Sequence, residues 1–357
     1  FHVPSSDPHP DEHAINQRLT ELRDHWGRNH KVCDAFPHLE VTMGQKAKDI
    51  IATDGGEMMI SSLVYEPIWF LEQYFDNLIA FTNKSTVVVA HLSLLSNYSE
   101  EDVERLVKHH PRLLVNCHRY FTHQYHGSLA HAHLRNIGWA LQLGLNFTHY
   151  VLMASNSWFI KRGMEEYVRY HSSSLQDSPV GRRWVHRYSI ADIPTEPRGG
   201  WDEKSVSSRI WAWKPMQSIV ANHVPEGEEH NFLTFAKHEG SFFPFPLMVR
   251  LYRALEADDN GLESMLQQKV YLEESLFATW TDHHRAEAGR RTGHSMTYHH
   301  CQSQGWGGET TAHVTPAQIR GILPLEGVFA VKCVGRHPED FDGTRAWLRD
   351  LALKSLT

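Results

Sequence analysis

The sequence predicts an α/β protein with a mostly parallel central sheet and helices on both of its faces. Runs rich in β-branched residues alternate with segments of helical periodicity, the pattern of parallel strands joined by crossover helices. With 357 residues, 41% of them hydrophobic, the chain can bury a sizeable core as one large domain or two ordinary ones. The strand-like runs are Met58–Tyr65, Thr86–Leu92, Arg112–Cys117 and His149–Ala154, and the helical segments lie at 67–82, 99–111 and 127–143.

Less regular segments precede and follow this alternation. Residues 1–12 are rich in Pro, Asp and His and predict a loose lead-in. Apolar residues then recur at helical spacing from Ile15 to Trp26, which predicts one amphipathic helix. After residue 172 the alternation fails. The later segments predict strands at 240–245 and 295–300, a flexible loop at 305–308, a helix starting at Thr315, a short apolar run at 329–333 and a last helix at 344–356.

The composition limits the partners and the location of the protein. The formal net charge is -7 and no Lys/Arg stripe stands out, so nucleic acid is not expected as a partner. No run of about 20 apolar residues occurs, so no transmembrane helix is expected within this chain. Residue 1 is Phe rather than Met, which is compatible with a signal or membrane anchor ahead of it.

The acceptor sequons favour a secretory lumen, and the cysteines are compatible with one. Three acceptor sequons are present, at Asn83-Lys-Ser, Asn97-Tyr-Ser and Asn146-Phe-Thr. The cysteines contain no C-x-x-C pair, which excludes a zinc ribbon or a thioredoxin motif, and they are compatible with two disulfides or with four buried thiols. The four cysteines are Cys33, Cys117, Cys301 and Cys333.

The stretch Tyr271–Trp280 is the first candidate for chemistry. It sets Glu273 and Glu274 at the head of an apolar helical turn, in which Leu272, Leu276, Phe277 and Trp280 predict one buried face. Two carboxylates in a first helical turn also complement the helix dipole, so a capping role is the alternative.

Three other places are candidates for binding. In parallel sheets ligands bind beyond the carboxyl ends of the strands, which selects residues 118–127 and 155–162. Lys332 stands in an apolar run, where a buried ammonium is costly unless it meets an anion. Trp201, Trp211 and Trp213 crowd an irregular region, where they form either a carbohydrate-stacking surface or a core beneath loops.

Several segments, in the right order over roughly residues 57–340, resemble the core-2/I-branching glycosyltransferase family with its xylosyltransferase and plant glucuronosyltransferase relatives. Residues 273–279 are similar to the family's D-E-x-L-W-A-T, and residues 149–161 to its Y-x-x-x-L-S/C-G-x-D-x-P-I-K. Residues 183–188 resemble R-W-K-K-R-Y. Further similar segments are 128–134 with 140–141, 165–168, 240–243, 297–298, 312–313 and 329–332.

The resemblance implies a GT-A type fold and transfer of GlcNAc, xylose or glucuronic acid, with inversion, from a UDP-sugar to a hydroxyl of a glycan or glycoprotein. It implies no metal and no other cofactor. Residues 1–50 would be a stem with an amphipathic helix, 51–172 the nucleotide-binding half and 173–357 the acceptor and catalytic half of one catalytic domain. The protein would be the ectodomain of a type II membrane protein of the Golgi lumen.

The resemblance, together with position and charge, suggests roles for individual residues. Glu274 matches the catalytic base, whose pKa the neighbouring Glu273 would raise by like-charge repulsion. Lys332 would stabilise the diphosphate, with Arg320 or Arg291 as a second cation. The donor loop would be formed by Ser155, Asn156, Ser157, His118, Arg119 and Tyr125. The acceptor would meet Glu273, Glu239, Gly240, Ser241, Trp211 and Trp213.

This chain departs from the family pattern at three places. Glu273 stands where the family has Asp, and Ser157 stands at the Asp of the donor-site loop. Tyr125-His126-Gly127 replaces W-G. Separately, no D-x-D follows the strand that begins at His149, which disfavours a divalent metal bound by Asp.

Three alternative functions stay open at this point. A histidine-metal hydrolase would use pairs such as His131/His133, His283/His284 or His299/His300, although two rings in H-x-H on a helix point about 200° apart. A glycoside hydrolase would need a second acid opposite Glu274. A non-catalytic relative would keep the fold and bind carbohydrate.

Overall fold

A computed structural model describes residues 37–53, 56–94, 96, 98–120, 122–123, 126–177, 185–197, 202–222, 231–258, 260–289, 291–299, 313–340 and 343–355. Several predictions fall outside these residues. They are the lead-in at 1–12, the helix at 15–26, Tyr125, Trp201, the loop at 305–308, and the cysteines Cys33 and Cys301.

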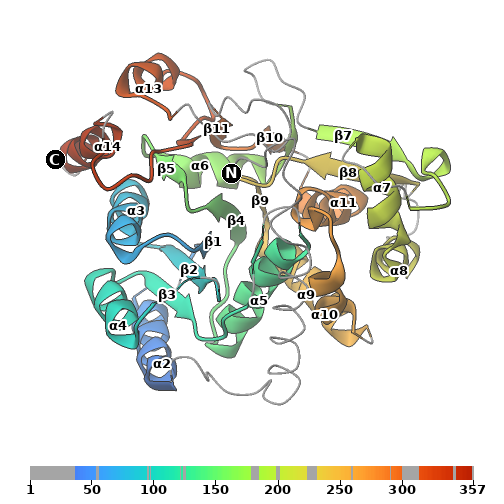
Figure 1. Cartoon of the computed structure of the whole chain (residues 1–357), viewed down its shortest axis with the longest axis horizontal. Helices are drawn as coiled ribbons and strands as arrows, with labels where there is room; N and C mark the ends of the chain where they lie inside the picture. Colours follow the sequence, from blue (N-terminus) through green and yellow to red (C-terminus); the bar gives the residue numbers. More distant parts are fainter. Residues whose placement is uncertain are drawn as a thin grey trace, which may run out of the picture.

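The central sheet has five strands in the order β3-β2-β1-β4-β9 (Figure 1). The first four are parallel, and β9 pairs with β4 in the antiparallel sense. Their bounds are β1 Met58–Val64, β2 Thr86–Leu92, β3 Leu113–Asn116, β4 His149–Ala154 and β9 Phe242–Pro244. The mostly parallel sheet is therefore confirmed. The strands β1 and β2 are buried at every position, as expected of strands covered on both faces.

Helices flank this sheet, which confirms the α/β class. The first four are α2 Pro37–Ala52, α3 Ile68–Phe81, α4 Glu100–His109 and α5 Ser128–Gln142. The predicted capping signal at Ser99 is confirmed, because its side chain accepts a hydrogen bond from the Asp102 N–H at the start of α4. The sequence pattern did not predict α2, whose buried face is a narrow stripe of Leu39, Met43 and Ala47.

The regular alternation of strands and helices ends after residue 172, as predicted. Within the described residues, the strands outside the central sheet are short and form three small sheets: β11-β12-β5, β10-β6 and β7-β8. Their bounds are β5 Ser157–Phe159, β6 Ser173–Gln176, β7 Val185–Ser189, β8 Phe232–Ala236, β10 Thr292–His294, β11 Thr297–His299 and β12 Ala330–Lys332. The helices that follow β4 in the chain are α6 Met164–His171, α7 Glu203–Ala212, α8 Lys214–Asn222, α9 Phe245–Ala257, α10 Gly261–Ser264, α11 Leu276–His283, α12 Arg285–Ala288, α13 Pro316–Ile322 and α14 Thr344–Ser355.

The two halves share one buried cluster of apolar side chains, which runs from Leu39 on α2 to Ala352 on α14. The predicted helix start at Thr315 is present as a capping box, in which Thr315 and Gln318 bond each other's backbone N–H.

Within the described residues, no helix is both long and apolar enough to cross a membrane. Cys117, which follows β3, and Cys333, which follows β12, are disulfide-bonded.

Candidate active site at the carboxyl edge of the sheet

The pairing of β9 with β4 places a polar segment beside the carboxyl end of β4. The Gly240 N–H donates to the Leu152 carbonyl at 2.7 Å, and the Leu152 N–H donates to the Ser241 carbonyl at 2.8 Å. Gly240 has φ +74°, and a Cβ atom there would lie 2.3 Å from Thr297 Oγ1. Only glycine fits this turn, which brings His238 and Glu239 to the edge where parallel sheets bind ligands.

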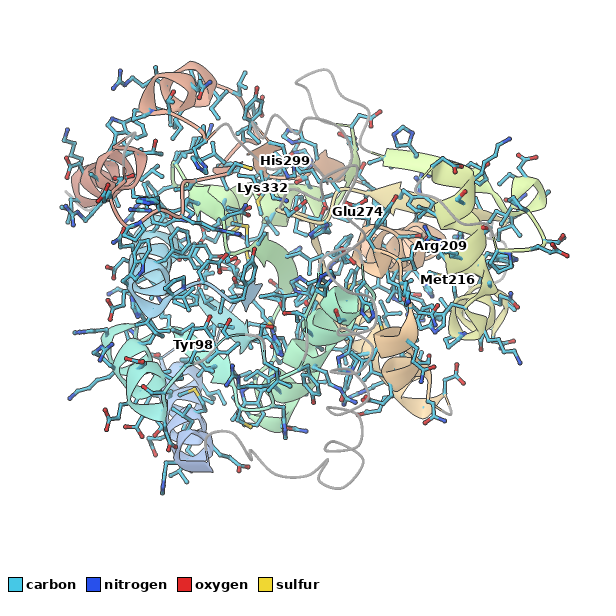
Figure 2. All side chains as sticks on the ribbon, in the orientation of Figure 1. Tyr98, Arg209, Met216, Glu274, His299 and Lys332 are labelled. Carbon is cyan, nitrogen blue, oxygen red and sulfur yellow. The ribbon has the colours of Figure 1, made fainter. Side chains whose placement is uncertain are left out.

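The small sheet β11-β12-β5 delivers a lysine and a histidine to the same edge. Lys332 lies opposite Ser157 of β5 and opposite His299 of β11 in the two strand registers. The Cys333 N–H also donates to the Asn156 carbonyl at 3.0 Å, which fixes the end of β12 to the loop after β4. Figure 2 shows Lys332 and His299 close together in the middle of the molecule, with Glu274 beside them.

Glu239 is the centre of the charged cluster. Its carboxylate is 4% exposed and pairs with the ammonium of Lys332. His238 Nε2 and His299 Nε2 each lie 3.4 Å from one of its oxygens. Burial alone would raise the pKa of Glu239, but the nearby charges of His238 and Lys332 hold it well below its usual range. Lys332 therefore pairs with an anion of its own chain, Glu239, as its apolar surroundings require.

The two histidines respond differently to this environment. Burial would lower the pKa of His238, but the Glu239 charge, contact with Glu274 and the Glu273 charge raise it. Burial, with the charge of Lys237, lowers the pKa of His299 well below its usual range. His238 is therefore the histidine that tends to carry a positive charge, and it stands between the Glu239 carboxylate and the pair Glu273/Glu274.

The stretch Tyr271–Trp280 differs from the amphipathic helix that the sequence predicts. Leu272–Glu274 forms a 3₁₀ turn, and α11 begins only at Leu276. Every residue of α11 is buried, so the helix is enclosed on all sides. The two carboxylates thus precede the helix in a separate turn, which gives them different surroundings.

The carboxyl group of Glu273 is buried, whereas that of Glu274 is exposed. Glu273 is 4% exposed, and its Oε2 has no hydrogen-bond partner among the described residues. Burial raises the pKa of Glu273 to about 8; the His238 charge opposes this shift and the Glu274 charge adds to it. The carboxyl whose pKa is raised is thus that of Glu273, whereas the sequence analysis expected repulsion to act on Glu274. The Glu274 side chain is 40% exposed, with Oε1 3.7 Å from His238 Nδ1.

A second charged cluster, which was not predicted from the sequence, lies at the carboxyl end of β1. Glu66 Oε1 accepts from Ser155 Oγ at 2.5 Å and lies 2.7 Å from Arg336 Nη2. The Arg336 guanidinium also stacks on the Tyr65 ring, 4.9 Å from its centroid. A signal was available, because Tyr65-Glu66 directly follows a buried strand of a parallel sheet, and such sheets bind ligands beyond the carboxyl ends of their strands.

The predicted donor-loop residues lie around these two clusters. Ser155 bonds Glu66, and Asn156 contacts the backbone of Cys333. Ser157 is buried in β5 opposite Lys332, and its hydroxyl has no hydrogen-bond partner among the described residues. The sequence prediction therefore named a loop that the structure does bring to Lys332.

His118 and Arg119 lie farther along the same edge of the sheet. The His118 ring packs edge-on against Trp139, at 5.9 Å between centroids. Arg119 donates to the Leu92 carbonyl at 3.3 Å and to the Ser93 carbonyl at 2.6 Å. These bonds tie the segment after β3 to the end of β2, so Arg119 has a structural contact there.

Arg320 and Arg291 do not join Lys332 through any contact in the described part of the chain. Arg320 is exposed on α13 and stacks on Trp347 of α14, 5.7 Å from the ring centroid. Arg291 is exposed and stacks on Tyr170, at 4.5 Å. Both arginines are thus held by aromatic surface residues.

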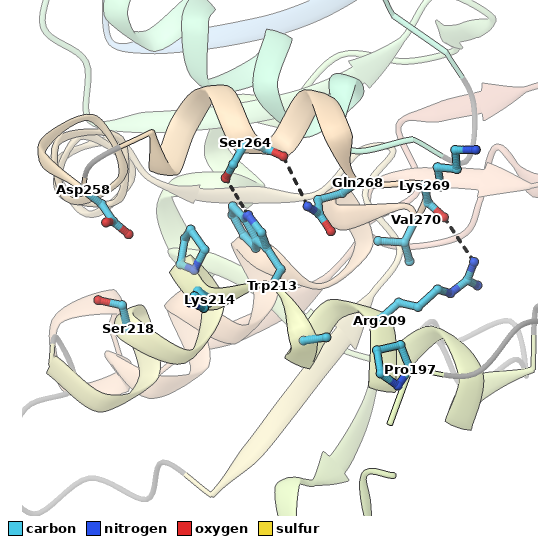
Figure 3. A pocket seen from close by; sticks show the side chains of 12 residues that line it. Pro197, Arg209, Trp213, Lys214, Ser218, Asp258, Ser264, Gln268, Lys269 and Val270 are labelled. Carbon is cyan, nitrogen blue, oxygen red and sulfur yellow. Dashed lines mark hydrogen bonds between the residues drawn. The ribbon is translucent and has the colours of Figure 1, made fainter. Parts of the chain in front are cut away.

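Trp211 and Trp213 belong to the corner between α7 and α8. Trp213 is 4% exposed, and its indole N–H donates to Ser264 Oγ at 2.8 Å, so it packs beneath the loops as core. It forms one wall of a pocket of about 550 Å³ (Figure 3). Trp211 is partly buried against the core. The pocket is lined by Pro197, Arg209, Ala212, Trp213, Lys214, Pro215, Ser218, Asp258, Ser264, Gln268, Lys269 and Val270.

The histidine pairs of the hydrolase alternative point to separate partners. His133 Nδ1 lies 2.8 Å from Ser61 Oγ, whereas the His131 ring packs on Tyr120 and approaches Glu263. Among the described residues, no three His, Cys, Asp or Glu side chains are grouped so as to hold a metal ion.

Comparison with known proteins gives little further guidance. No family model matches the chain, and no curated protein matches it. Among solved structures, it is similar to the apo structure of the WbbM bifunctional glycosyltransferase, with a TM-score of 0.33 and 11% sequence identity over 85% of this chain. The chain spans 50% of that protein's length. No inference about activity follows from a similarity of this size.

Proposed function

We propose that the protein is an inverting glycosyltransferase that moves a sugar from a UDP-sugar to a hydroxyl group of a glycan or glycoprotein. One observation carries the proposal. An exposed carboxylate, Glu274, connects through His238 to the buried Glu239 and the cation Lys332, beside the carboxyl end of β4. This is the edge at which open α/β sheets bind ligands. The donor sugars to test first are GlcNAc, xylose and glucuronic acid, which the family resemblance implies.

The first requirement of this chemistry is a general base. The acceptor O–H proton passes to a carboxylate oxygen of Glu274 as the acceptor oxygen bonds to the anomeric carbon. The Glu274 side chain is 40% exposed and can meet an acceptor from solvent. Glu273 is buried, with a pKa raised to about 8, and so holds its own proton at neutral pH. Of the two neighbours, Glu274 is the base.

The second requirement is stabilisation of the leaving group. As the bond from the anomeric carbon to the diphosphate oxygen breaks, its electron pair leaves with UDP, and negative charge grows on the diphosphate. An ammonium group carries three N–H donors, and the Lys332 side chain is 21% exposed. Lys332 can therefore keep its bond to Glu239 and still present a donor to a phosphate oxygen.

We include no metal ion in this proposal. The loop after β4 reads Ser155-Asn156-Ser157 and offers no carboxylate of the kind that holds a divalent cation beside a diphosphate. Lys332 supplies positive charge at that position instead.

The experiment is a thermal-shift panel of UDP-sugars, with and without EDTA. We expect at least one UDP-sugar to raise the melting temperature, and EDTA to leave the increase unchanged. If no UDP-sugar stabilises the protein, the transferase proposal fails; if glycans alone stabilise it, the protein is a carbohydrate-binding relative. Loss of the shift in EDTA would instead remove the metal-free part of the mechanism.

A further inference from the structure

We propose that Asn83 and Asn146 carry N-linked glycans, placed side by side on the edge of the sheet opposite the candidate active site. Each residue heads an acceptor sequon, Asn83-Lys-Ser85 and Asn146-Phe-Thr148. Both asparagines are exposed. The third sequon, at Asn97, lies outside the described residues and takes no part in the argument.

Each sequon stands in a turn that leads into a parallel strand. Asn83 lies between the end of α3 at Phe81 and the start of β2 at Thr86. Its backbone is anchored on both sides, because its N–H donates to Glu165 Oε1 at 2.6 Å and its carbonyl accepts from Arg112. Asn146 lies just ahead of β4, which begins at His149. In both turns the asparagine is exposed to water.

The hydroxyl residues of the two sequons meet at one residue, Glu57. Ser85 Oγ donates to Glu57 Oε2 at 3.2 Å, and Thr148 Oγ1 donates to the Glu57 carbonyl at 2.7 Å. Glu57 directly precedes β1, which pairs with β2 on one side and with β4 on the other. Neighbouring strands lie about 4.8 Å apart, so the two turns are separated by about 10 Å. Two glycans attached there would stand next to each other.

This edge is far from the proposed chemistry. The strands β2 and β4 have 7 and 6 residues and run from the sequon turns towards the opposite edge. At a rise of about 3.3 Å per residue, the sequons lie about 20 Å from the carboxyl ends of the strands. Glycans at Asn83 and Asn146 would therefore cover the amino edge and leave Glu274 and Lys332 open.

The cysteines support the compartment that this modification requires. Cys117 and Cys333 are disulfide-bonded, and disulfides persist in oxidising compartments such as the lumen of the endoplasmic reticulum. N-linked glycans are added in that same lumen. The modification does not depend on the proposed transferase activity.

The test is peptide mapping of the full chain, expressed behind a cleavable secretion signal in eukaryotic cells with Asn97→Gln in place. We expect treatment with peptide N-glycosidase to convert both Asn83 and Asn146 to Asp. The variants Asn83→Gln and Asn146→Gln should each lose one glycan. As a matched pair, Ser85→Ala should lose the glycan at Asn83 and Ser85→Thr should keep it. An unmodified asparagine at either position, in cells that glycosylate a co-expressed control protein, would overturn the proposal.

A separate control tests whether the glycans at Asn83 and Asn146 lie on the edge opposite the candidate site. Leu94→Asn creates an Asn-Leu-Ser sequon just beyond the carboxyl end of β2, on the candidate site's edge. We expect a glycan at position 94 to weaken UDP-sugar binding by about tenfold, and removal of the glycans at Asn83 and Asn146 to change the Kd by less than about twofold. A tenfold effect of the latter glycans would refute the opposite-edge placement. If no form binds a UDP-sugar, the proposed function fails, while the mapped glycans still decide the modification.

Discussion

The substitution Glu273→Gln tests the division between the two neighbouring carboxyl groups. Burial raises the pKa of Glu273 to about 8 from an ordinary value of 4.5. Between these values the folded protein keeps the proton while the unfolded chain releases it. The stabilisation from the protonated group is thus complete below about pH 4.5 and is lost as the pH rises through about 8.

The magnitude follows from linkage. One proton held only by the folded state makes the free energy of unfolding fall by about 1.4 kcal/mol per pH unit. From about pH 5 to about pH 7.5 this amounts to about 3 kcal/mol. Glutamine has the shape of the protonated carboxyl group and does not titrate. The variant should therefore gain about 3 kcal/mol of stability relative to wild type across this window.

The assay is urea unfolding of both proteins at half-unit steps of pH. His238, Glu274 and Glu239 also face Glu273, and they remain in both proteins, so their titration largely cancels in the difference. The control is Glu263→Gln. Burial would raise the pKa of Glu263, but His131 and Arg135 lower it to about 2, so titration of the Glu263 carboxyl itself adds nothing to the difference from wild type above about pH 5. Parallel pH profiles for wild type and Glu273→Gln would refute the reasoning.

Three further predictions follow from the same site. Glu274→Gln should keep UDP-sugar binding and lower the rate of transfer by roughly 100-fold or more, as measured by UDP release; unchanged transfer would place the base elsewhere. Lys332→Ala removes the ammonium group from the buried carboxylate of Glu239 and leaves His238 as its positive neighbour. This variant should cost about 3 kcal/mol in urea unfolding and weaken UDP binding about tenfold, whereas Arg320→Ala should do neither. Gly240→Ala should cost about 2 kcal/mol or more, because φ is +74° and the added Cβ meets Thr297; an unchanged unfolding midpoint would contradict the steric requirement for glycine in this turn.

Much of the fold could be predicted because strand and helix periodicities are local properties. The predicted bounds of β2 and β4 match those in the structure, and the capping signals at Ser99 and Thr315 mark true helix starts. The helix α2 was missed because its apolar stripe is narrow and its burial depends on packing against β3. Short apolar segments were harder still to predict from the sequence. In Tyr271–Trp280 the spacing predicted one buried face, and the surrounding elements enclose all of α11.

The candidate site, like the fold, could be predicted only in part. From sequence alone, Lys332 needed an anion, Gly240 stood in a strand-like run, and Glu273 and Glu274 formed an acidic pair. The residue types and their local spacing determined these points. The sequence could not determine that Glu239 is the anion, because the contact spans 93 positions in the chain and depends on the register of β12 against β5.

Tertiary structure also decided which carboxyl group is suited to act as a base. Glu273 and Glu274 are adjacent and chemically identical, so no local pattern separates them. Packing around the 3₁₀ turn buries one and exposes the other, and desolvation then raises the pKa of Glu273. The sequence by itself determined the α/β fold class and the residue types of the site. Long-range packing decided their pairing, because burial and charge environment are properties of the assembled chain.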